Sequence, residues 1–251
     1  MNFLRPLLIA LQFLTRLPIT LRELPNERET GLSMLFYPCV GLLIGGLLAA
    51  LGMAATYTHA PTALCAALLV ALWVGLTGGL HLDGLADSVD GWIGGQGRPE
   101  RILEIMKDPR CGPMGVIALL LVVLLKFSAV LALLEMGGAP LLLLAPLLGR
   151  MALPLLFFST PYVRRGGLGS ILASHFPRRP SVVVVLLFSL TILAAYTWNG
   201  ALAVGAAMGA FTLLRRTMRQ TIGGTTGDTA GALVEVVEVA VVVALGLFSG
   251  A

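Results

Sequence analysis

The sequence predicts an all-α, polytopic integral membrane protein with about seven transmembrane helices and an additional N-terminal helix. Of its 251 residues, 57% are hydrophobic and only 12% are charged, which is about half the charged fraction of an ordinary soluble domain. Several apolar runs also approach the ~20 residues that a helix needs to cross a bilayer. We therefore expect a single membrane domain over residues 1–251, embedded in a lipid bilayer.

Apolar runs and the polar segments between them give the order of the predicted helices. Residues 3–17 are apolar but short and carry arginines near both ends, so we expect an interfacial or half-inserted helix there. No small-residue cleavage site follows this stretch, and we expect no removable signal peptide. The predicted spans are, in order, 31–56, 61–80, 114–134, 140–159, 181–198, 201–214 and 229–249.

Positive charges segregate to one side of this predicted topology. The turns on one side of the membrane contain no lysine or arginine, and the loops on the other side contain 13 of the 17 in the chain. These loops are 18–30, 81–113, 160–180 and 215–228. Because Lys and Arg accumulate on the cytoplasmic side, we expect these loops to face the cytoplasm. The net charge of only +4 gives no reason to expect a nucleic-acid partner.

The segment HLDGLADSVDG directly follows an apolar run. Its aspartates, Asp83, Asp87 and Asp90, have i, i+4, i+7 spacing, which places them on one face of a helix. Their mutual repulsion next to a membrane would be offset by a divalent cation, and Mg²⁺ prefers carboxylate oxygens. Gly84 and Gly91 would let phosphate groups approach the backbone. The alternative is a solvated acidic helix end.

A second acidic face begins the last span. Asp228, Glu235 and Glu238 have i, i+7, i+10 spacing in GGTTGDTAGALVEVVE, and two of them lie inside the apolar run. Intramembrane carboxylates are costly and usually functional. The alternative is that they pair with Lys126 or Arg150 of neighbouring spans, and both interpretations can hold together.

The glycine-rich start of the same block is a candidate anion site. Gly223, Gly224 and Thr226 precede the expected helix start, where free backbone N–H groups favour an anion. The nearby Asp228 strengthens this interpretation.

Two further groups of residues are candidates for binding phosphate or moving a proton. In MKDPRCGPMG, Lys107 and Arg110 could hold phosphate groups, and Asp108 could add a fourth carboxylate beside the metal. His81 could act as a general base or bind phosphate, with a polar anchor at the membrane interface as the alternative. We expect the arginines of the 160–180 loop to anchor the membrane surface, with phosphate binding as the alternative.

Together these patterns predict Mg²⁺-dependent phosphotransfer at the membrane. Carboxylates on two segments of one side, cationic loops and glycines fit a diphosphate substrate attacked by an alcohol. No Cys–His or Ser–His nucleophile pair is apparent in the sequence.

At these same residues the chain resembles the cobalamin synthase, or adenosylcobinamide-GDP ribazoletransferase, family. The resembling blocks are ALQFLTRLPI (10–19), GGLHLDGLADSVDG (78–91), MKDPRCGPMG (106–115) and GGTTGDTAGALVEVVE (223–238). They occur in the expected order over nearly the whole chain. Pro109 departs from the Ser that often precedes the arginine in this family.

The resemblance implies a membrane-bound, Mg²⁺-dependent enzyme of the bacterial inner membrane with a cytoplasmic active site. Its substrates would be adenosylcobinamide-GDP and α-ribazole or its 5′-phosphate, with release of GMP. Candidate metal ligands are Asp83, Asp87, Asp90 and Asp228. Candidate catalytic residues are His81, Asp87 and Lys107. Candidate substrate-binding residues are Asp108, Arg110, Gly223, Gly224, Thr226, Glu235 and Glu238.

Two other functions stay open from the residues alone. A CDP-alcohol phosphotransferase has a related aspartate-and-glycine signature, but it places Arg where this chain has Asp87. An ion-coupled transporter would explain the intramembrane charges, although no repeat is evident. The glycine-rich segments 41–52 and 200–209 are compatible with a homo-oligomer.

Overall fold

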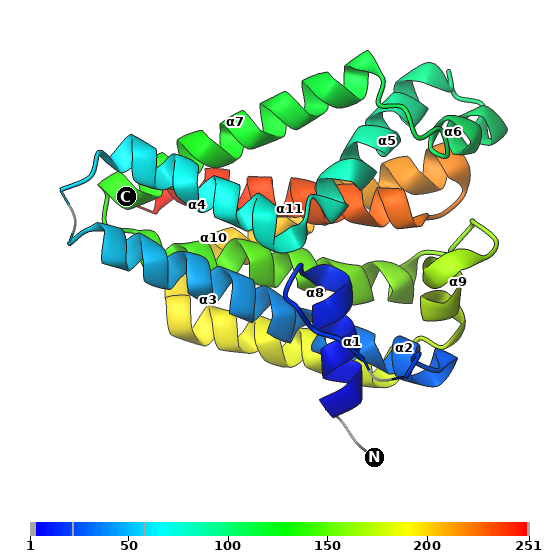
Figure 1. The fold of residues 1–251 in the computed structure, drawn as a ribbon, viewed down its shortest axis with the longest axis horizontal. Helices are drawn as coiled ribbons and strands as arrows, with labels where there is room; N and C mark the ends of the chain where they lie inside the picture. Colours follow the sequence, from blue (N-terminus) through cyan, green and yellow to red (C-terminus); the bar gives the residue numbers. More distant parts are fainter. Residues whose placement is uncertain (1–3, 22, 58, 250–251) are drawn as a thin grey trace.

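The computed structural model describes residues 4–21, 23–57 and 59–249 (Figure 1). Residue 3 of the predicted N-terminal helix and Arg22 of the first polar loop therefore lie outside the described residues. The helices are α1 Leu4–Leu14, α2 Glu27–Ser33, η1 Met34–Phe36, α3 Tyr37–Ala55, α4 Thr62–Thr77, α5 Leu80–Gly94, α6 Pro99–Ile105, α7 Pro113–Glu135, η2 Ala139–Leu143, α8 Leu144–Ser159, α9 Gly167–Ser174, α10 Arg178–Ile222 and α11 Gly227–Phe248. Within the described residues, β-type pairing is limited to one isolated bridge between Tyr162 and Thr225. The predicted all-α fold class is confirmed.

Five described helical segments are long and apolar enough to cross a membrane. They are Glu27–Ala55, Pro113–Glu135, Ala139–Ser159, Arg178–Ile222 and Gly227–Phe248. The pair formed by α4 and α5 passes the same test, but its two helices are bent by 87°. The polytopic architecture is as expected, and the seven predicted spans correspond to these six helical segments, because one segment contains two of them.

The difference in number arises mainly at α10. This 45-residue helix contains both predicted spans 181–198 and 201–214, and it is interrupted at Thr197, where φ is 44° and ψ is −113°. Gly200 packs beside this break, because a Cβ there would lie 2.6 Å from the backbone oxygen of Ile192. Figure 1 shows the chain turning back at this point, so α10 has two legs that run in opposite directions.

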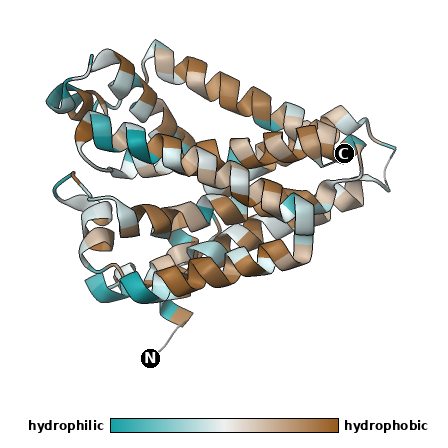
Figure 2. Ribbon diagram, turned by 180° about the vertical axis from the view of Figure 1, so that it is seen from behind, coloured by the Kyte–Doolittle hydropathy of each residue, from teal (hydrophilic) through white to brown (hydrophobic). Residues whose placement is uncertain are grey.

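Polar residues gather at one end of the bundle. Figure 2 shows hydrophilic colours around α2, α6 and the end of α10, and hydrophobic colours along the helices. The C-terminal end of α11 lies at the opposite end (Figure 1). This arrangement is the one that the segregation of Lys and Arg along the sequence predicts.

The N-terminal helix α1 runs across the direction of α3 rather than along it (Figure 1). It has only 11 residues, too few to cross a hydrocarbon core at 1.5 Å per residue. It contacts α2, η1 and α3, and its end is tied to α4 because the backbone N–H of Arg16 donates to Leu76 O at 2.7 Å. These features fit the predicted interfacial helix.

The break between α4 and α5 sets the position of the aspartate-rich segment. Gly78 and Gly79 have φ values of 62° and 70°, in the left-handed region that favours glycine. At this break the chain turns by 87°. The helix α5, with its three aspartates, therefore turns away from the direction of the apolar helix α4.

A buried network of charged groups joins α11 to α7 and α8. The Lys126 ammonium donates to Glu235 at 2.7 Å and to Glu238 at 2.5 Å, and the Arg150 guanidinium also donates to Glu238. All four side chains are at most 3% exposed. Lys126 also lies over the ring of Trp73 in α4, 4.3 Å from its centroid. Two positive and two negative charges balance, so the network is neutral as a set.

We predict that Lys126→Met destabilises the protein strongly, because Glu235 would lose its cation inside a low-dielectric interior. Removal of one partner of a buried ion pair costs about 3–5 kcal/mol. Unfolding of the purified protein in detergent, by heat or by increasing SDS, measures the effect.

Glu135→Gln is the matched control, since Glu135 is an exposed residue of the same helix. Equal stability of the Lys126→Met and Glu135→Gln proteins would contradict a structural role for the network.

Candidate active site

Helix α5 packs closely against the beginning of α11. A Cβ on Gly84 would lie 2.7 Å from the backbone oxygen of Asp228, and a Cβ on Gly231 would lie 3.4 Å from the backbone of His81. Gly91 faces α6 instead, where a Cβ would lie 2.8 Å from the side chain of Met106. The expectation that Gly84 and Gly91 admit phosphate groups to the backbone is therefore wrong: these glycines let helices approach each other.

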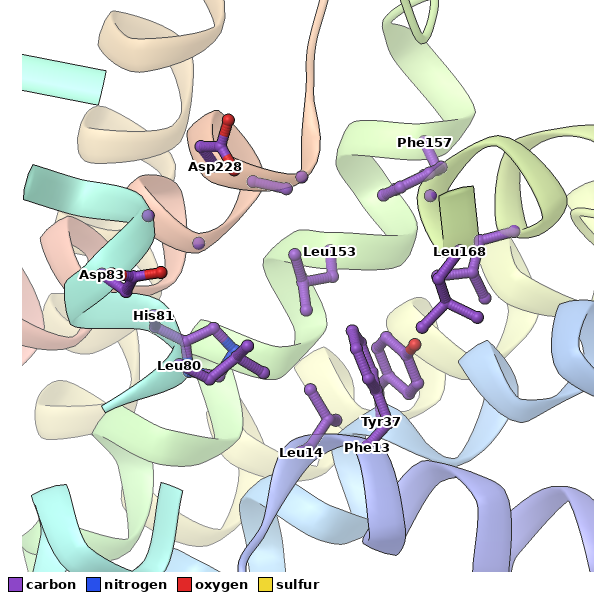
Figure 3. Close-up of a pocket in the computed structure, with 16 residues that line it drawn as sticks. Phe13, Leu14, Tyr37, Leu80, His81, Asp83, Leu153, Phe157, Leu168 and Asp228 are labelled. Carbon is purple, nitrogen blue, oxygen red and sulfur yellow. The ribbon is translucent and has the colours of Figure 1, made fainter. Parts of the chain in front are cut away.

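This packing brings the two predicted acidic segments to one pocket of about 220 Å³. Its wall contains Asp83 from α5 and Asp228 from α11, together with His81 (Figure 3). The His81 side chain is 3% exposed, and its buried Nδ1 atom has no hydrogen-bond partner within the described residues. The rest of the wall is mainly apolar and comes from α1, α3, α8 and α9. The pocket thus combines two carboxylates, a mainly apolar wall and an imidazole nitrogen that has no hydrogen-bond partner among the described residues.

The aspartates of α5 lie close enough to each other and to Asp228 of α11 to change the pKa of Asp87. The pKa of Asp87 is raised to about 6 by partial burial, and next by the negative charges of Asp83 and Asp228. The described residues contain no group of three or more His, Cys, Asp or Glu side chains already placed to hold a metal ion. Mg²⁺ prefers carboxylate oxygens and completes its shell with water and substrate phosphates, so it does not need a complete set of protein ligands. The carboxylates of Asp83 and Asp228 at the pocket wall are donors of this kind.

Asp90 is used to hold α7. Its carboxylate accepts hydrogen bonds from the backbone N–H groups of Gly112 at 2.7 Å and Gly115 at 2.8 Å. These residues are the N-cap and third residue of α7, where unpaired N–H groups and the helix dipole favour an anion. Asp90 thereby fixes the start of α7 against α5.

The MKDPRCGPMG segment reaches the aspartate face of α5 through this contact. The pKa of the Cys111 thiol is raised by burial and next by the negative charges of Asp90 and Asp87. Arg110 donates two hydrogen bonds to Asp108, at 3.0 and 2.8 Å, which lower the pKa of Asp108 to about 2. Lys107 is exposed. The side chains of this segment are not part of the pocket wall.

The GGTTG loop is held in place by contacts with the rest of the chain. Gly223 ends α10 with φ of 75°, and Gly224 packs against Pro161, whose backbone oxygen would lie 2.2 Å from a Cβ. Thr225 N–H donates to Pro161 O at 2.9 Å. Thr226 caps α11, because its hydroxyl accepts from Thr229 N–H at 3.3 Å and its own N–H donates to the Thr229 hydroxyl at 2.9 Å. The loop positions Asp228 at the first turn of α11.

Arg164 is a site residue whose pairing the sequence did not indicate. Its Nη2 donates to Asp228 Oδ2 at 2.6 Å. The two residues are 64 positions apart, so no spacing pattern links them. The basic composition of the 160–180 loop is the available signal, and it favours membrane anchoring over phosphate binding.

Glu235 and Glu238 lie deeper in the bundle than the pocket. They form the buried ion network with Lys126 and Arg150, as one of the two sequence-based interpretations expected, and they do not line the pocket. Their predicted contact with substrate is therefore at most indirect.

The arrangement has the components of phosphotransfer to an alcohol. Carboxylates of two helices can share a cation that holds a diphosphate. The buried imidazole at the same pocket can accept a proton from an attacking hydroxyl. The apolar wall suits a substrate with a large non-polar body.

Comparisons with known proteins give the family of the chain. The sequence profile of the cobalamin-5-phosphate synthase family matches residues 6–246. Proteins named adenosylcobinamide-GDP ribazoletransferase are 55% identical in Stutzerimonas stutzeri (98% of this chain, 99% of that protein) and 54% identical in Pseudomonas aeruginosa (97% and 98%). No solved structure matches the chain. On the extent of the profile match and the near-complete coverage of these relatives, the chain belongs to the cobalamin-5-phosphate synthase family.

Proposed function

We propose that this protein joins adenosylcobinamide-GDP to α-ribazole or α-ribazole 5′-phosphate, giving adenosylcobalamin or its 5′-phosphate, and releases GMP. The observation that carries the proposal is the convergence of Asp83 and Asp228 on one pocket in a chain whose relatives are named adenosylcobinamide-GDP ribazoletransferase. The family match favours this reaction over the transfer of a phosphoalcohol from CDP.

The reaction is a substitution at phosphorus. The ribose 3′-hydroxyl oxygen of α-ribazole attacks the phosphorus that is attached to the aminopropanol arm of the corrinoid. A new P–O bond forms, and the bond from this phosphorus to the bridging oxygen of the diphosphate breaks. The electron pair of that bond leaves with GMP, and the hydroxyl proton passes to a base on the protein. Nothing is oxidised or reduced.

His81 is the proposed base. Its Nδ1 lies in the pocket region without a partner in the described part of the chain, so it is available to accept a proton. Burial disfavours a charged imidazole, which keeps the ring neutral before the reaction. A neutral imidazole near the attacking hydroxyl is the arrangement that general-base catalysis needs.

Asp83, Asp87 and Asp228 are the proposed Mg²⁺ ligands. When bound, Mg²⁺ would neutralise the diphosphate and stabilise the departing phosphate. Asp90, whose two oxygens already accept backbone hydrogen bonds, would support the site by holding α7. This division of roles assigns three carboxylates to the metal ion and uses the fourth to fix the scaffold.

Lys107 and Arg110 are the proposed phosphate-holding cations of the substrate-bound state. Both side chains are exposed. Asp90 ties their segment to α5, so their positive charges lie at the same end of the protein as the aspartates of α5. Asp108 would orient Arg110 through its paired hydrogen bonds. In this proposal the active site faces the cytoplasm of a bacterial inner membrane, as the positive charges of the polar loops favour.

The proposed reaction is tested by measuring GMP release from the purified protein in lipid vesicles or detergent. We expect release only when adenosylcobinamide-GDP, α-ribazole 5′-phosphate and Mg²⁺ are all present, and we expect EDTA to abolish it. GMP release that needs no α-ribazole, or CMP release from a CDP-alcohol, would overturn the proposal.

Asp87→Asn is expected to lower kcat/KM at least about 100-fold, because metal charge stabilisation is worth several kcal/mol and each 1.4 kcal/mol is a factor of ten. The substitution removes the charge and nearly keeps the shape. Rates are measured over a range of Mg²⁺ concentrations.

Glu104→Gln is the control for Asp87→Asn, since Glu104 is an exposed carboxylate that pairs with Arg101 on α6. Wild-type turnover with unchanged Mg²⁺ dependence in Asp87→Asn would remove Asp87 from the ligand set.

His81→Gln is expected to lower kcat by about 100- to 10,000-fold, the usual contribution of a general base, with little change in either KM. The amide fits the same volume but cannot take up a proton. The pH dependence of kcat separates this role from a packing role: the acidic limb of the profile should flatten in His81→Gln. A parallel rise in both KM values with an unchanged profile would instead assign His81 to packing.

A further inference from the structure

Residues 159–164 run from the last residue of α8 toward α9 and pair with the GGTTG loop at the beginning of α11. We call these residues the strap. Arg215 of α10 holds its first part by donating to Ser159 O at 2.7 Å and to the Thr160 hydroxyl at 3.1 Å. Its second part pairs with the GGTTG loop, because Val163 N–H donates to Thr225 O at 2.9 Å. The backbone of the strap is therefore fixed at both parts.

Arg164 is the last residue of the strap and uses only part of its donor capacity. Its Nη2 donates to Asp228, whereas its Nε is buried and has no partner among the described residues. The side chain as a whole is 23% exposed. A buried N–H without an acceptor is costly, which indicates that the guanidinium gains an acceptor in another state of the protein.

The present partner of Arg164 is also a carboxylate of the pocket wall. A cation that binds Asp228 places like charge beside the guanidinium, and the two repel. Phosphate groups that enter with the cation offer several oxygens, to which the planar guanidinium fork binds bidentately. The geometry thus offers Arg164 a new acceptor at the moment when its pair with Asp228 becomes unfavourable.

We propose that Arg164 competes with the metal ion for Asp228 and transfers its hydrogen bonds to the phosphates of the nucleoside diphosphate when both ligands bind. Arg164 is then a substrate-binding residue whose pair with Asp228 keeps the carboxylate ordered and neutralised in the absence of ligand. The phosphate part of this inference rests on the proposed function, whereas the competition for Asp228 does not. Because the strap holds the backbone, the transfer requires movement of the side chain alone.

The competition is tested by titrating the purified protein with Mn²⁺ alone and measuring free Mn²⁺ by electron paramagnetic resonance. Loss of the guanidinium should tighten Mn²⁺ binding by Arg164→Ala about tenfold, since a close charge pair commonly changes binding by this order. Arg165→Ala is the matched control, because Arg165 is the next residue in the sequence and its side chain is exposed. The tightening should vanish in the double variant Arg164→Ala/Asp228→Asn.

The phosphate contact is tested by steady-state kinetics and by GDP binding in the presence of Mn²⁺. Arg164→Ala should raise the KM for adenosylcobinamide-GDP and the Kd for GDP about 10- to 100-fold, and leave the KM for unphosphorylated α-ribazole within twofold. Arg164→Lys should restore only part of the loss, because a single ammonium does not reproduce the fork.

The possible outcomes distinguish the competition for Asp228 from the contact with phosphate. Unchanged or weaker Mn²⁺ binding by Arg164→Ala, with a melting temperature like that of wild type, overturns the competition. Equal increases of KM for both substrates, or unchanged GDP binding, overturn the phosphate contact. If Mn²⁺ binding tightens but wild-type protein releases no GMP from the corrinoid substrate, the proposed function fails while the competition for Asp228 stands. If Arg164→Ala does not fold, Arg164→Lys carries both tests, with smaller effects of the same sign.

Discussion

The arrangement of this protein depends on the buried ion network that joins Lys126 and Arg150 to Glu235 and Glu238. Inside a membrane bundle there is little hydrophobic force to choose one helix register over another, because lipid is as apolar as the side chains. Paired charges do choose a register, since a shift of α11 by one turn would leave carboxylates or cations buried without partners. The network therefore fixes how far α11 extends beside α7 and α8.

The position of Asp228 follows from this constraint. Asp228 lies seven residues before Glu235 on the same helix, so a fixed register for the glutamates also fixes the aspartate at the polar end of the bundle. The capping interaction of Thr226 then holds the first turn of α11, and Gly84 allows α5 to approach it closely. An interaction in the apolar interior thus positions a carboxylate where a charged substrate can reach it.

Much of the fold and part of the site could be predicted from the sequence. Apolar runs and the segregation of Lys and Arg indicated the spans and the polar end, because both reflect the bilayer directly. The i, i+4, i+7 spacing of Asp83, Asp87 and Asp90 correctly implied a helix, since such spacing is local. The alternative pairing of Glu235 and Glu238 with Lys126 and Arg150 could be named because each charge stands out in an apolar run.

The remaining features depend on contacts between distant segments. The pairing of Arg164 with Asp228 and the capping of α7 by Asp90 join residues that no periodicity connects. The glycines of α5 are a related case: the sequence shows that Cβ atoms are absent, but only the packing shows that neighbouring chain, rather than phosphate, fills the space.

We propose that α5 and α11 together hold one divalent cation at the pocket. The most direct measurement is the anomalous diffraction signal of Mn²⁺ in crystals of the protein grown with Mn²⁺ and GDP. The account predicts a peak within coordination distance of carboxylate oxygens from both helices, with Asp228 among the ligands. A peak bound by α5 alone, or one at the exposed acidic residues of α6, would contradict it.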